Sequence, residues 1–218
     1  MTVFAGRMTW MIPPGRAVFI PARQSHSIRM WGEVAMKSLY FPADFPGAAF
    51  KTAECSVIAV TGLLRELILR VVVLAALDCR VAEDIHIMSV LVDELAGAAS
   101  GPLALPLPAD ARALAAAREV LRNPAGRMDL DSVAKQCGAG ARTLERLFQS
   151  ETGMRFGLWR QKARLLESIR LLVESRSVTH AALECGYSSV SAYIAAFRQT
   201  FGCTPRTVLL NGGAGLPW

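Results

Sequence analysis

The spacing of hydrophobic and polar positions changes along the chain and divides it into three stretches. Between residues 8 and 41, short apolar runs are separated by turns that contain Gly or Pro, which is typical of antiparallel strands. The runs that predict strands cover residues 8–12, 17–20, 26–31 and 33–41. From about residue 56 to residue 98, apolar residues recur at helical spacing. The third stretch is again helical.

The helical region 56–98 carries few polar positions in its first half. Such a helix is either deeply buried or packs on a partner chain, so we expect a homodimer formed through 56–98. The most apolar run, 57–77, is interrupted by Arg65, Glu66 and Arg70. Three charges within one span are costly in lipid, so we predict core helices and no membrane partner.

Residues 100–109 hold three prolines within ten positions. A run of this composition does not form a regular helix and predicts a linker. We therefore expect a sensor and dimerisation region at 1–99 and a second domain at 110–210.

The second domain contains a weak internal repeat, and each copy predicts a helix-turn-helix unit. In each copy a short helix ends at a glycine, which accepts the left-handed backbone of a helix stop. A small residue in that helix allows a second helix to cross closely. Ser188 or Ser189 is a suitable N-cap for the last helix, and Gly140 is a poorer one. The units cover 130–151 and 178–200, with Ala134, Cys137 and Gly138 matched by Ala182, Cys185 and Gly186.

Between the copies, an apolar stripe at helical spacing predicts one connecting helix over 155–173. A helix of that length spans roughly 28 Å at about 1.5 Å per residue. Adjacent major grooves on one face of DNA lie about 34 Å apart. The connector therefore suits two recognition helices in successive grooves; the alternative is an ordinary helical bundle with a chance repeat.

Charge and cysteine content agree with this division. Residues 1–108 carry 9 basic and 9 acidic side chains, whereas residues 109–218 carry 15 basic and 9 acidic ones. A basic half joined to a balanced half suits a polyanion-binding module beside a sensor or oligomerisation module. The five cysteines are odd in number and show no CxxC spacing, so we expect reduced thiols and neither disulfides nor a zinc site.

At this point the chain resembles the AraC/XylS family of bacterial transcription regulators. The resemblance covers about 110–210 and is carried by RTLERLFQSETG, FGLWRQKARLLESIRLL and SVTHAALECGYSSVSAYIAAFRQTFGCTP. It implies a sequence-specific DNA-binding regulator in the bacterial cytoplasm, associated with the nucleoid. The implied partners are double-stranded promoter DNA, a small-molecule effector and, for an activator, RNA polymerase.

The resemblance and the helical pattern together predict which side chains face DNA. Arg146 is the first candidate because Arg donates two hydrogen bonds to guanine, and Arg142 contacts either base or phosphate. The alternative is that these charges are solvated or pair with Glu145 or Glu151. The expected base contacts are Arg142, Thr143, Glu145, Arg146, Ser189, Val190 and Ser191; the expected phosphate contacts are Gln149, Arg160, Arg198, Gln199 and Arg206.

The N-terminal region partly resembles a cupin. Gly15, Pro21 and His26 match its second motif, and Arg23 stands where that motif has a glycine. The first cupin motif, which brings the metal ligands, is absent, so we expect no metal. Either the sensor is degenerate or the start lies too far downstream, and sheet edges stay open unless a dimer covers them. His26 and Tyr40 are the candidate effector-binding residues.

The predicted fold class is α+β, with a short, partly cupin-like antiparallel β region and dimerisation helices before an all-α domain. In that domain a long helix joins two helix-turn-helix units. We expect no catalytic residues and no cofactor. Two other function classes remain open at this point: a metal-dependent cupin enzyme and an adaptor that does not bind DNA.

Overall fold

The computed structural model describes residues 1–30, 35–42, 45, 55–98, 103–126 and 128–210. Two antiparallel sheets form its N-terminal part. The four-stranded sheet has the order β4-β1-β2-β6, and the second sheet pairs β3 with β5. The strands are β1 Thr2–Ala5, β2 Met8–Met11, β3 Arg16–Phe19, β4 His26–Arg29, β5 Ser56–Ala59 and β6 Ala104–Pro106.

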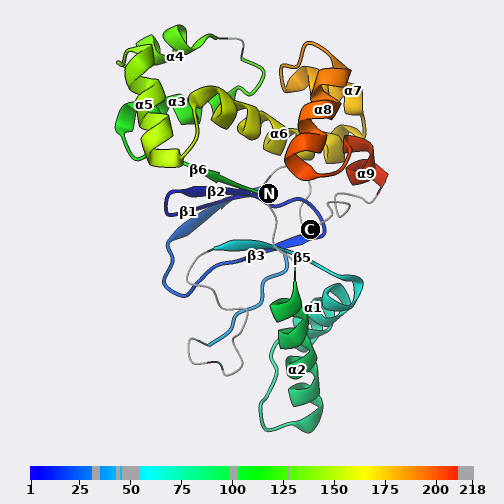
Figure 1. Ribbon diagram of the computed structural model, residues 1–218. Helices are drawn as coiled ribbons and strands as arrows, with labels where there is room; N and C mark the ends of the chain where they lie inside the picture. Colours follow the sequence, from blue (N-terminus) through cyan, green and yellow to red (C-terminus); the bar gives the residue numbers. More distant parts are fainter. Residues whose placement is uncertain (31–34, 43–44, 46–54, 99–102, 127, 211–218) are drawn as a thin grey trace.

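Helices make up most of the rest of the described chain, and Figure 1 shows how they are arranged. The α1–α2 hairpin lies at one end of the molecule, and α3 to α9 form a helical layer at the other end, with the four-stranded sheet beneath α6. The helices are α1 Gly62–Leu74, α2 Ala82–Gly97, α3 Ala111–Arg122, α4 Leu130–Gln136, α5 Ala141–Thr152, α6 Phe156–Ser175, α7 Val178–Glu184, α8 Val190–Phe201 and α9 Pro205–Leu210.

This arrangement confirms the predicted fold class: a short antiparallel β region precedes an all-helical domain in which α6 joins two helix-turn-helix units. Among the described residues, no helix combines the length and the hydropathy needed to cross a bilayer.

The structure differs from the sequence-based expectation in three segments, one expected strand that does not form and two strands that were not expected. Residues 35–41 form no strand, although their apolar positions partly alternate; residues 33 and 34 lie outside the described residues. Ser56–Ala59, which we expected to open a helical region, is strand β5 paired with β3. Thr2–Ala5 forms β1, which the pattern did not predict. In each case the outcome depends on whether a neighbouring strand is available, and periodicity carries no information about that.

The expected linker 100–109 also takes part in the fold. Residues 100–102 lie outside the described residues, but 104–106 form β6, which pairs with β2. Leu103 and Leu105 are fully buried, and the indole Nε1 of Trp159 donates to the carbonyl of Pro106 over 2.6 Å. The described part of this segment is therefore a strand at the seam between sheet and helices and not a free tether.

We expect Leu103→Ala to lower the free energy of unfolding by about 2–5 kcal/mol, because it leaves a cavity at a fully buried site. Urea denaturation followed by circular dichroism measures the loss. Leu183→Ala is the control, since Leu183 is 59% exposed and its truncation should change stability by less than about 0.5 kcal/mol. A loss as small as the control's would mean that residues 103–106 do not pack on the sheet in solution.

Candidate nucleic-acid interface

The first helix-turn-helix unit consists of α4 and α5. The Asp129 side chain caps α4 by accepting a hydrogen bond from the backbone N–H of Ser132 over 2.8 Å. Gly138 follows in the left-handed region at φ +68°, which is the backbone that ends a helix in a tight turn. Helix α5 then begins after Gly140, which supplies no side-chain cap. Leu144 and Phe148 are fully buried and fix which face of α5 points outward.

The outward face of α5 carries most of the predicted reading residues. Arg142, Arg146 and Gln149 are exposed and lie at intervals of four and three, so they form one stripe along the helix. Thr143 and Glu145 beside them are half-buried. Within the described residues, neither Arg142 nor Arg146 forms an ion pair.

The second unit, α7 and α8, repeats this geometry with better caps. Ser177 caps α7 through the N–H of His180 at 3.2 Å, and Ser189 caps α8 through the N–H of Ala192 at 3.1 Å. Between the two helices, Gly186 has φ +76°. A ladder of aromatic rings forms the buried face of α8: Tyr193, Phe197 and Phe201, with neighbouring centroids 5.7 and 4.6 Å apart.

The outward face of the second unit is smaller and less polar. Ser189 and Ser191 are exposed and Val190 is half-buried, and the Ser189 hydroxyl also serves as the helix cap. Further along, Arg198 and Gln199 are exposed on α8, and Arg206 is exposed on α9. The two units therefore present unequal surfaces, with cations on α5 and short side chains at the start of α8.

Helix α6 holds the two units together through one buried face. Trp159, Leu165, Ile169 and Leu172 on this face are fully buried. Ser168 is buried as well, and its hydroxyl accepts a 3.0 Å hydrogen bond from the hydroxyl of Tyr193 on α8. Since α6 packs against α3 and α5 on one side and against α7, α8 and α9 on the other, it sets the relative placement of α5 and α8.

Two arginines of α6 bind the loop between α3 and α4. Arg164 donates to the carbonyls of Pro124 and Gly126, both over 2.7 Å. Arg160 donates to the carbonyl of Met128 over 2.7 Å, and its guanidinium lies 5.5 Å from the centroid of the Phe156 ring. Part of each guanidinium is therefore occupied within the protein. Sequence reasoning missed this role, since nothing in the helical pattern shows that a backbone loop lies within reach.

The same loop also contacts the second unit. A Cβ atom at Gly186 would lie 3.1 Å from the carbonyl oxygen and 3.2 Å from the Cα atom of Ala125. Residues 124–126 therefore lie between the turn of the second unit and the guanidinium of Arg164.

Glu151, at the end of α5, joins the first unit to the sheet. Its carboxylate accepts hydrogen bonds from the backbone N–H groups of Ala109 and Asp110 at 2.6 and 3.1 Å. It also lies 3.6 Å from the guanidinium of Arg7, in the turn between β1 and β2. Glu151 thus forms no ion pair with Arg146, although the sequence left that pairing open.

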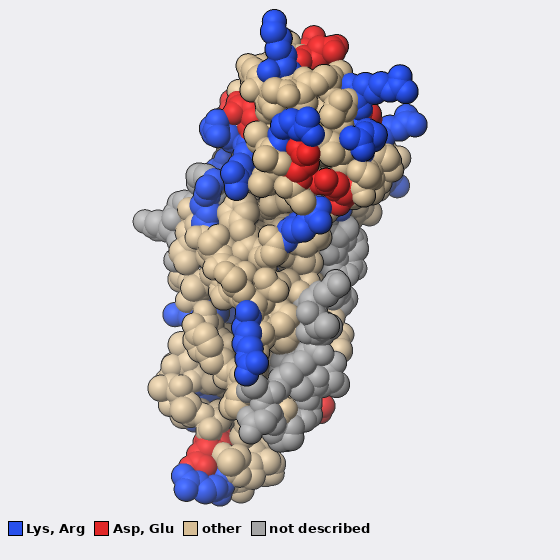
Figure 2. Space-filling model, turned by 90° about the vertical axis from the view of Figure 1, so that its left-hand side faces the viewer, with Lys and Arg blue, Asp and Glu red and all other residues tan. Residues whose placement is uncertain are grey.

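Charge is concentrated on the helical end of the molecule. Figure 2 shows Lys and Arg side chains gathered over that end, whereas the surface below it is mostly uncharged. Such a basic surface raises the local concentration of a polyanion and accelerates its association.

The remaining candidate residues do not form a polar centre. His26, His86 and His180 lie on different elements, and no three His, Cys, Asp or Glu side chains of the described residues are placed to hold a metal ion. His26 is exposed, with Nδ1 3.0 Å from the carbonyl oxygen of Gln24. Tyr40 is 92% exposed, and neither His26 nor Tyr40 lines the cavity between the sheet and α6. Burial raises the pKa of the Cys185 thiol to about 12, so this thiol stays protonated and serves as a packing group.

These features define a DNA-binding protein of the helix-turn-helix class. Residues 133–210 match the family model described as a helix-turn-helix domain. The chain is 29% identical over 196 residues to the HTH-type transcriptional regulator NimR of Escherichia coli, covering 90% of this chain and 71% of the relative. It is 36% identical over 116 residues to the HTH-type transcriptional regulator RipA of Corynebacterium glutamicum, covering 51% of this chain and 35% of the relative.

Among solved structures, an AraC-type DNA-binding domain protein from Chromobacterium violaceum is 27% identical. The match covers 46% of this chain and 91% of that one, with a TM-score of 0.45. Residues 133–210 thus form a helix-turn-helix domain, and the chain is similar to HTH-type transcriptional regulators, in agreement with the resemblance to the AraC/XylS family that its motifs show. Its curated relatives are regulators and not enzymes, so the metal-dependent enzyme considered from the sequence is set aside.

The contact between Gly186 and Ala125 can be tested with a matched glycine pair. Gly138→Ala should cost about 1–2 kcal/mol, because an alanine at φ +68° is strained although the space around it is open. Gly186→Ala should cost more, because its Cβ would also press on Ala125. Thermal unfolding of both variants measures the difference. Equal losses would show that the loop does not pack against the second turn.

Proposed function

We propose that this chain regulates transcription by placing α5 and α8 in successive major grooves on one face of a promoter site. The observation that carries this proposal is the single buried connector. Helix α6 has 20 residues and spans roughly 30 Å at about 1.5 Å per residue, close to the groove repeat of about 34 Å. Both units pack on it, so both helices are presented together.

The exposed residues of the two units fall into two groups, proposed base contacts and proposed phosphate contacts. On α5, the proposed base contacts are Arg142, Thr143, Glu145 and Arg146; on α8 they are Ser189, Val190 and Ser191. The short side chains at the start of α8 suit contact with thymine methyl groups and a fit to the backbone.

Phosphate contacts position the protein along the duplex without reading sequence. Gln149, Arg198, Gln199 and Arg206 are exposed and suit this role, although Gln149 also donates to the carbonyl of Gly153 over 3.2 Å. Arg160 contributes through the N–H groups that Met128 leaves available.

We expect Arg146→Ala to weaken binding to a selected genomic fragment by about 1–3 kcal/mol and to relax preference at one base position. The measurement is a set of affinities for the fragment and its single-base variants at fixed salt. Arg198→Ala is the comparison: it should weaken binding to every sequence alike and reduce the slope of log affinity against log salt by about one.

The control for both variants is Lys37→Ala, since Lys37 is exposed in the N-terminal region, outside both the helical domain and the segment 56–98. An unchanged base preference after Arg146→Ala would contradict the assignment of α5. Equal, weak binding of the wild-type chain to all duplexes would contradict the proposed function itself and favour a non-DNA adaptor.

We further propose that 56–98 forms a homodimer interface. Helices α1 and α2 consist largely of apolar residues, yet Leu64 and Leu91 are the only side chains on them that are buried. The exposed apolar side chains include Leu63, Val73 and Val90, at 53, 77 and 42%. A hairpin with so little core of its own gains stability from a partner surface, and a second copy supplies the same face through two-fold symmetry.

We expect Val73→Glu to shift the chain from dimer to monomer in sedimentation velocity, because a charge at the interface has no partner there. Leu210→Glu is the matched control: Leu210 is 76% exposed but lies on α9, and the variant should sediment like the wild type. A wild-type chain that remains a monomer at every concentration would contradict this interface.

Three further parts of the proposal rest on the resemblance to AraC/XylS regulators. A small molecule bound by the N-terminal region controls DNA binding, RNA polymerase is the partner if the regulator activates, and the protein acts in the cytoplasm on nucleoid DNA. His26 and Tyr40 remain exposed candidates for the effector.

A further inference from the structure

A groove of about 210 Å³ lies between the two helix-turn-helix units. Its lining residues are Met154 in the turn after α5, Leu158, Gln161 and Lys162 on the first half of α6, and Thr200 in the last turn of α8. We refer to it as the central groove. Because its walls come from both units and from the connecting helix, whatever occupies it lies between α5 and α8.

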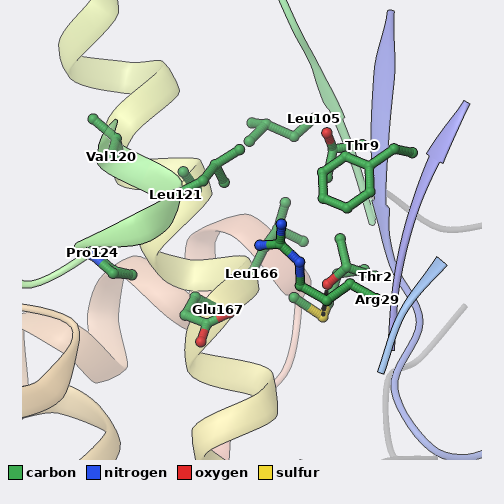
Figure 3. A pocket seen from close by; sticks show the side chains of 12 residues that line it. Thr2, Thr9, Arg29, Leu105, Val120, Leu121, Pro124, Leu166 and Glu167 are labelled. Carbon is green, nitrogen blue, oxygen red and sulfur yellow. Dashed lines mark hydrogen bonds between the residues drawn. The ribbon is translucent and has the colours of Figure 1, made fainter. Parts of the chain in front are cut away.

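The central groove lies on the side of α6 that faces away from the sheet. Figure 3 shows Leu166 and Glu167 on the side of α6 that lines the cavity beside the four-stranded sheet. At about 100° per residue, these two positions are centred roughly 140° around the helix from Leu158, Gln161 and Lys162. The sheet therefore does not cover the groove.

The exposed stripe of α5 is directed the same way. On α5, the carboxylate of Glu151 lies beside Arg7 in the turn between β1 and β2. At about 100° per residue, the stripe of Arg142, Arg146 and Gln149 is centred roughly 170° around α5 from Glu151. The stripe and the central groove thus both face away from the sheet, so a duplex that lies along the stripe and reaches α8 passes over the groove.

Lys162 is the cation of the central groove, and it has no carboxylate partner. Among the described residues it takes part in no ion pair. Its side chain is half-buried, and burial lowers the pKa of its ammonium group because the charged form loses water. Leu158 lies one turn earlier on the same face of α6 and is 57% exposed. The groove therefore combines a partly desolvated cation with an apolar rim, and an incoming anion supplies the missing counter-charge.

The geometry of DNA indicates which anion reaches this point. A duplex that is read in two successive major grooves on one face turns the intervening minor groove toward the middle of the protein. The two sugar–phosphate strands that border this minor groove then lie nearest to α6, between α5 and α8. Each phosphate carries one negative charge, and the deoxyribose beside it offers apolar surface to a side chain such as Leu158.

We propose that Lys162 binds a backbone phosphate beside the minor groove that separates the two major-groove contacts. Leu158 packs against the neighbouring deoxyribose. This inference rests on the proposed function, since it requires α5 and α8 on one duplex. A contact at this point fixes how closely the centre of the duplex approaches α6, and it thereby links the positions of the two recognition helices on their site.

The test measures the affinity of the full chain for a selected genomic fragment in which single phosphates between the two major-groove contacts are replaced by neutral methylphosphonates. In the wild type, neutralising the contacted phosphate should weaken binding about tenfold, because a charge-assisted hydrogen bond is lost. Lys162→Met keeps an apolar stem and removes the charge. It should weaken binding to the unmodified fragment by a similar factor and show no further loss when that phosphate is neutralised. Lys162→Arg, which keeps the charge, should retain the wild-type pattern.

Two controls separate a phosphate contact from a structural role. Lys37→Met changes an exposed lysine of the N-terminal region and should bind every fragment as the wild type does. In the absence of DNA, Lys162→Met should melt no lower than the wild type, because it removes a partly desolvated charge that has no partner.

The proposal is overturned if Lys162→Met binds the fragment like the wild type, or if its effect adds in full to that of a methylphosphonate at every central position. A lower melting temperature for DNA-free Lys162→Met would also contradict it, since Lys162 would then stabilise the fold. Micromolar binding of inorganic phosphate to the DNA-free wild type, lost in Lys162→Met, would assign the groove to a small anion instead of DNA.

Failure of this inference can be told apart from failure of the proposed function. If only the Lys162 contact is wrong, the wild type still selects its genomic fragment and Arg146→Ala still changes the base preference. If the proposed function is wrong, the wild type itself binds all duplexes alike, before any variant is compared.

Discussion

The burial of one face of α6 is the constraint on which the rest of the structure depends. This face carries Trp159, Leu165, Ile169 and Leu172, all fully buried. Burying a large apolar side chain contributes about 1.5–3 kcal/mol, so a few such positions match a sizeable part of the stability of an ordinary domain. Because the sheet and both helix-turn-helix units pack on this one helix, a shift of α6 moves α5, α8 and the seam with the sheet.

The hydrogen bonds around α6 restrict how the packed loop and helices are positioned relative to α6. Apolar contacts alone allow a loop to slide, but the guanidinium of Arg164 bonds two carbonyls of the same loop. The hydroxyl pair of Tyr193 and Ser168 acts in the same way on the other side. These bonds are largely shielded from water, where a polar group that loses its partner is costly. They therefore favour one arrangement of the two units over its neighbours.

The helical domain could be predicted from the sequence because its signals are local. Left-handed glycines, polar helix caps and apolar spacing lie within about two dozen residues in each unit, and α5 and α8 end one residue beyond the predicted ends of the units at 151 and 200. The short strands could be predicted less well from the sequence. Ser56–Ala59 and Ala104–Pro106 become strands because β3 and β2 lie beside them, and no local pattern contains that partner.

The exposed face of α5 could likewise be predicted from local signals, whereas the contacts made by the residues around it could not. Once Leu144 and Phe148 are assigned to the core, the outward position of Arg142 and Arg146 follows from helix geometry. The partners of Arg160, Arg164 and Glu151 do not follow from it. Each bonds to backbone groups more than thirty residues away in the sequence. Only the folded chain brings such pairs together.

Glu151 has a consequence for anyone who would give this regulator a new operator. A direct way to change the operator is to replace α5 with the corresponding helix of a relative, treated as an independent unit. Here the last turn of that helix contains the carboxylate that bonds Ala109 and Asp110 and lies beside Arg7. An exchanged helix without an acidic residue at this position would change the exposed residues proposed to read DNA and would also lose the hydrogen bonds to Ala109 and Asp110 and the ion pair with Arg7. The part of α5 that can be exchanged freely therefore ends before Glu151.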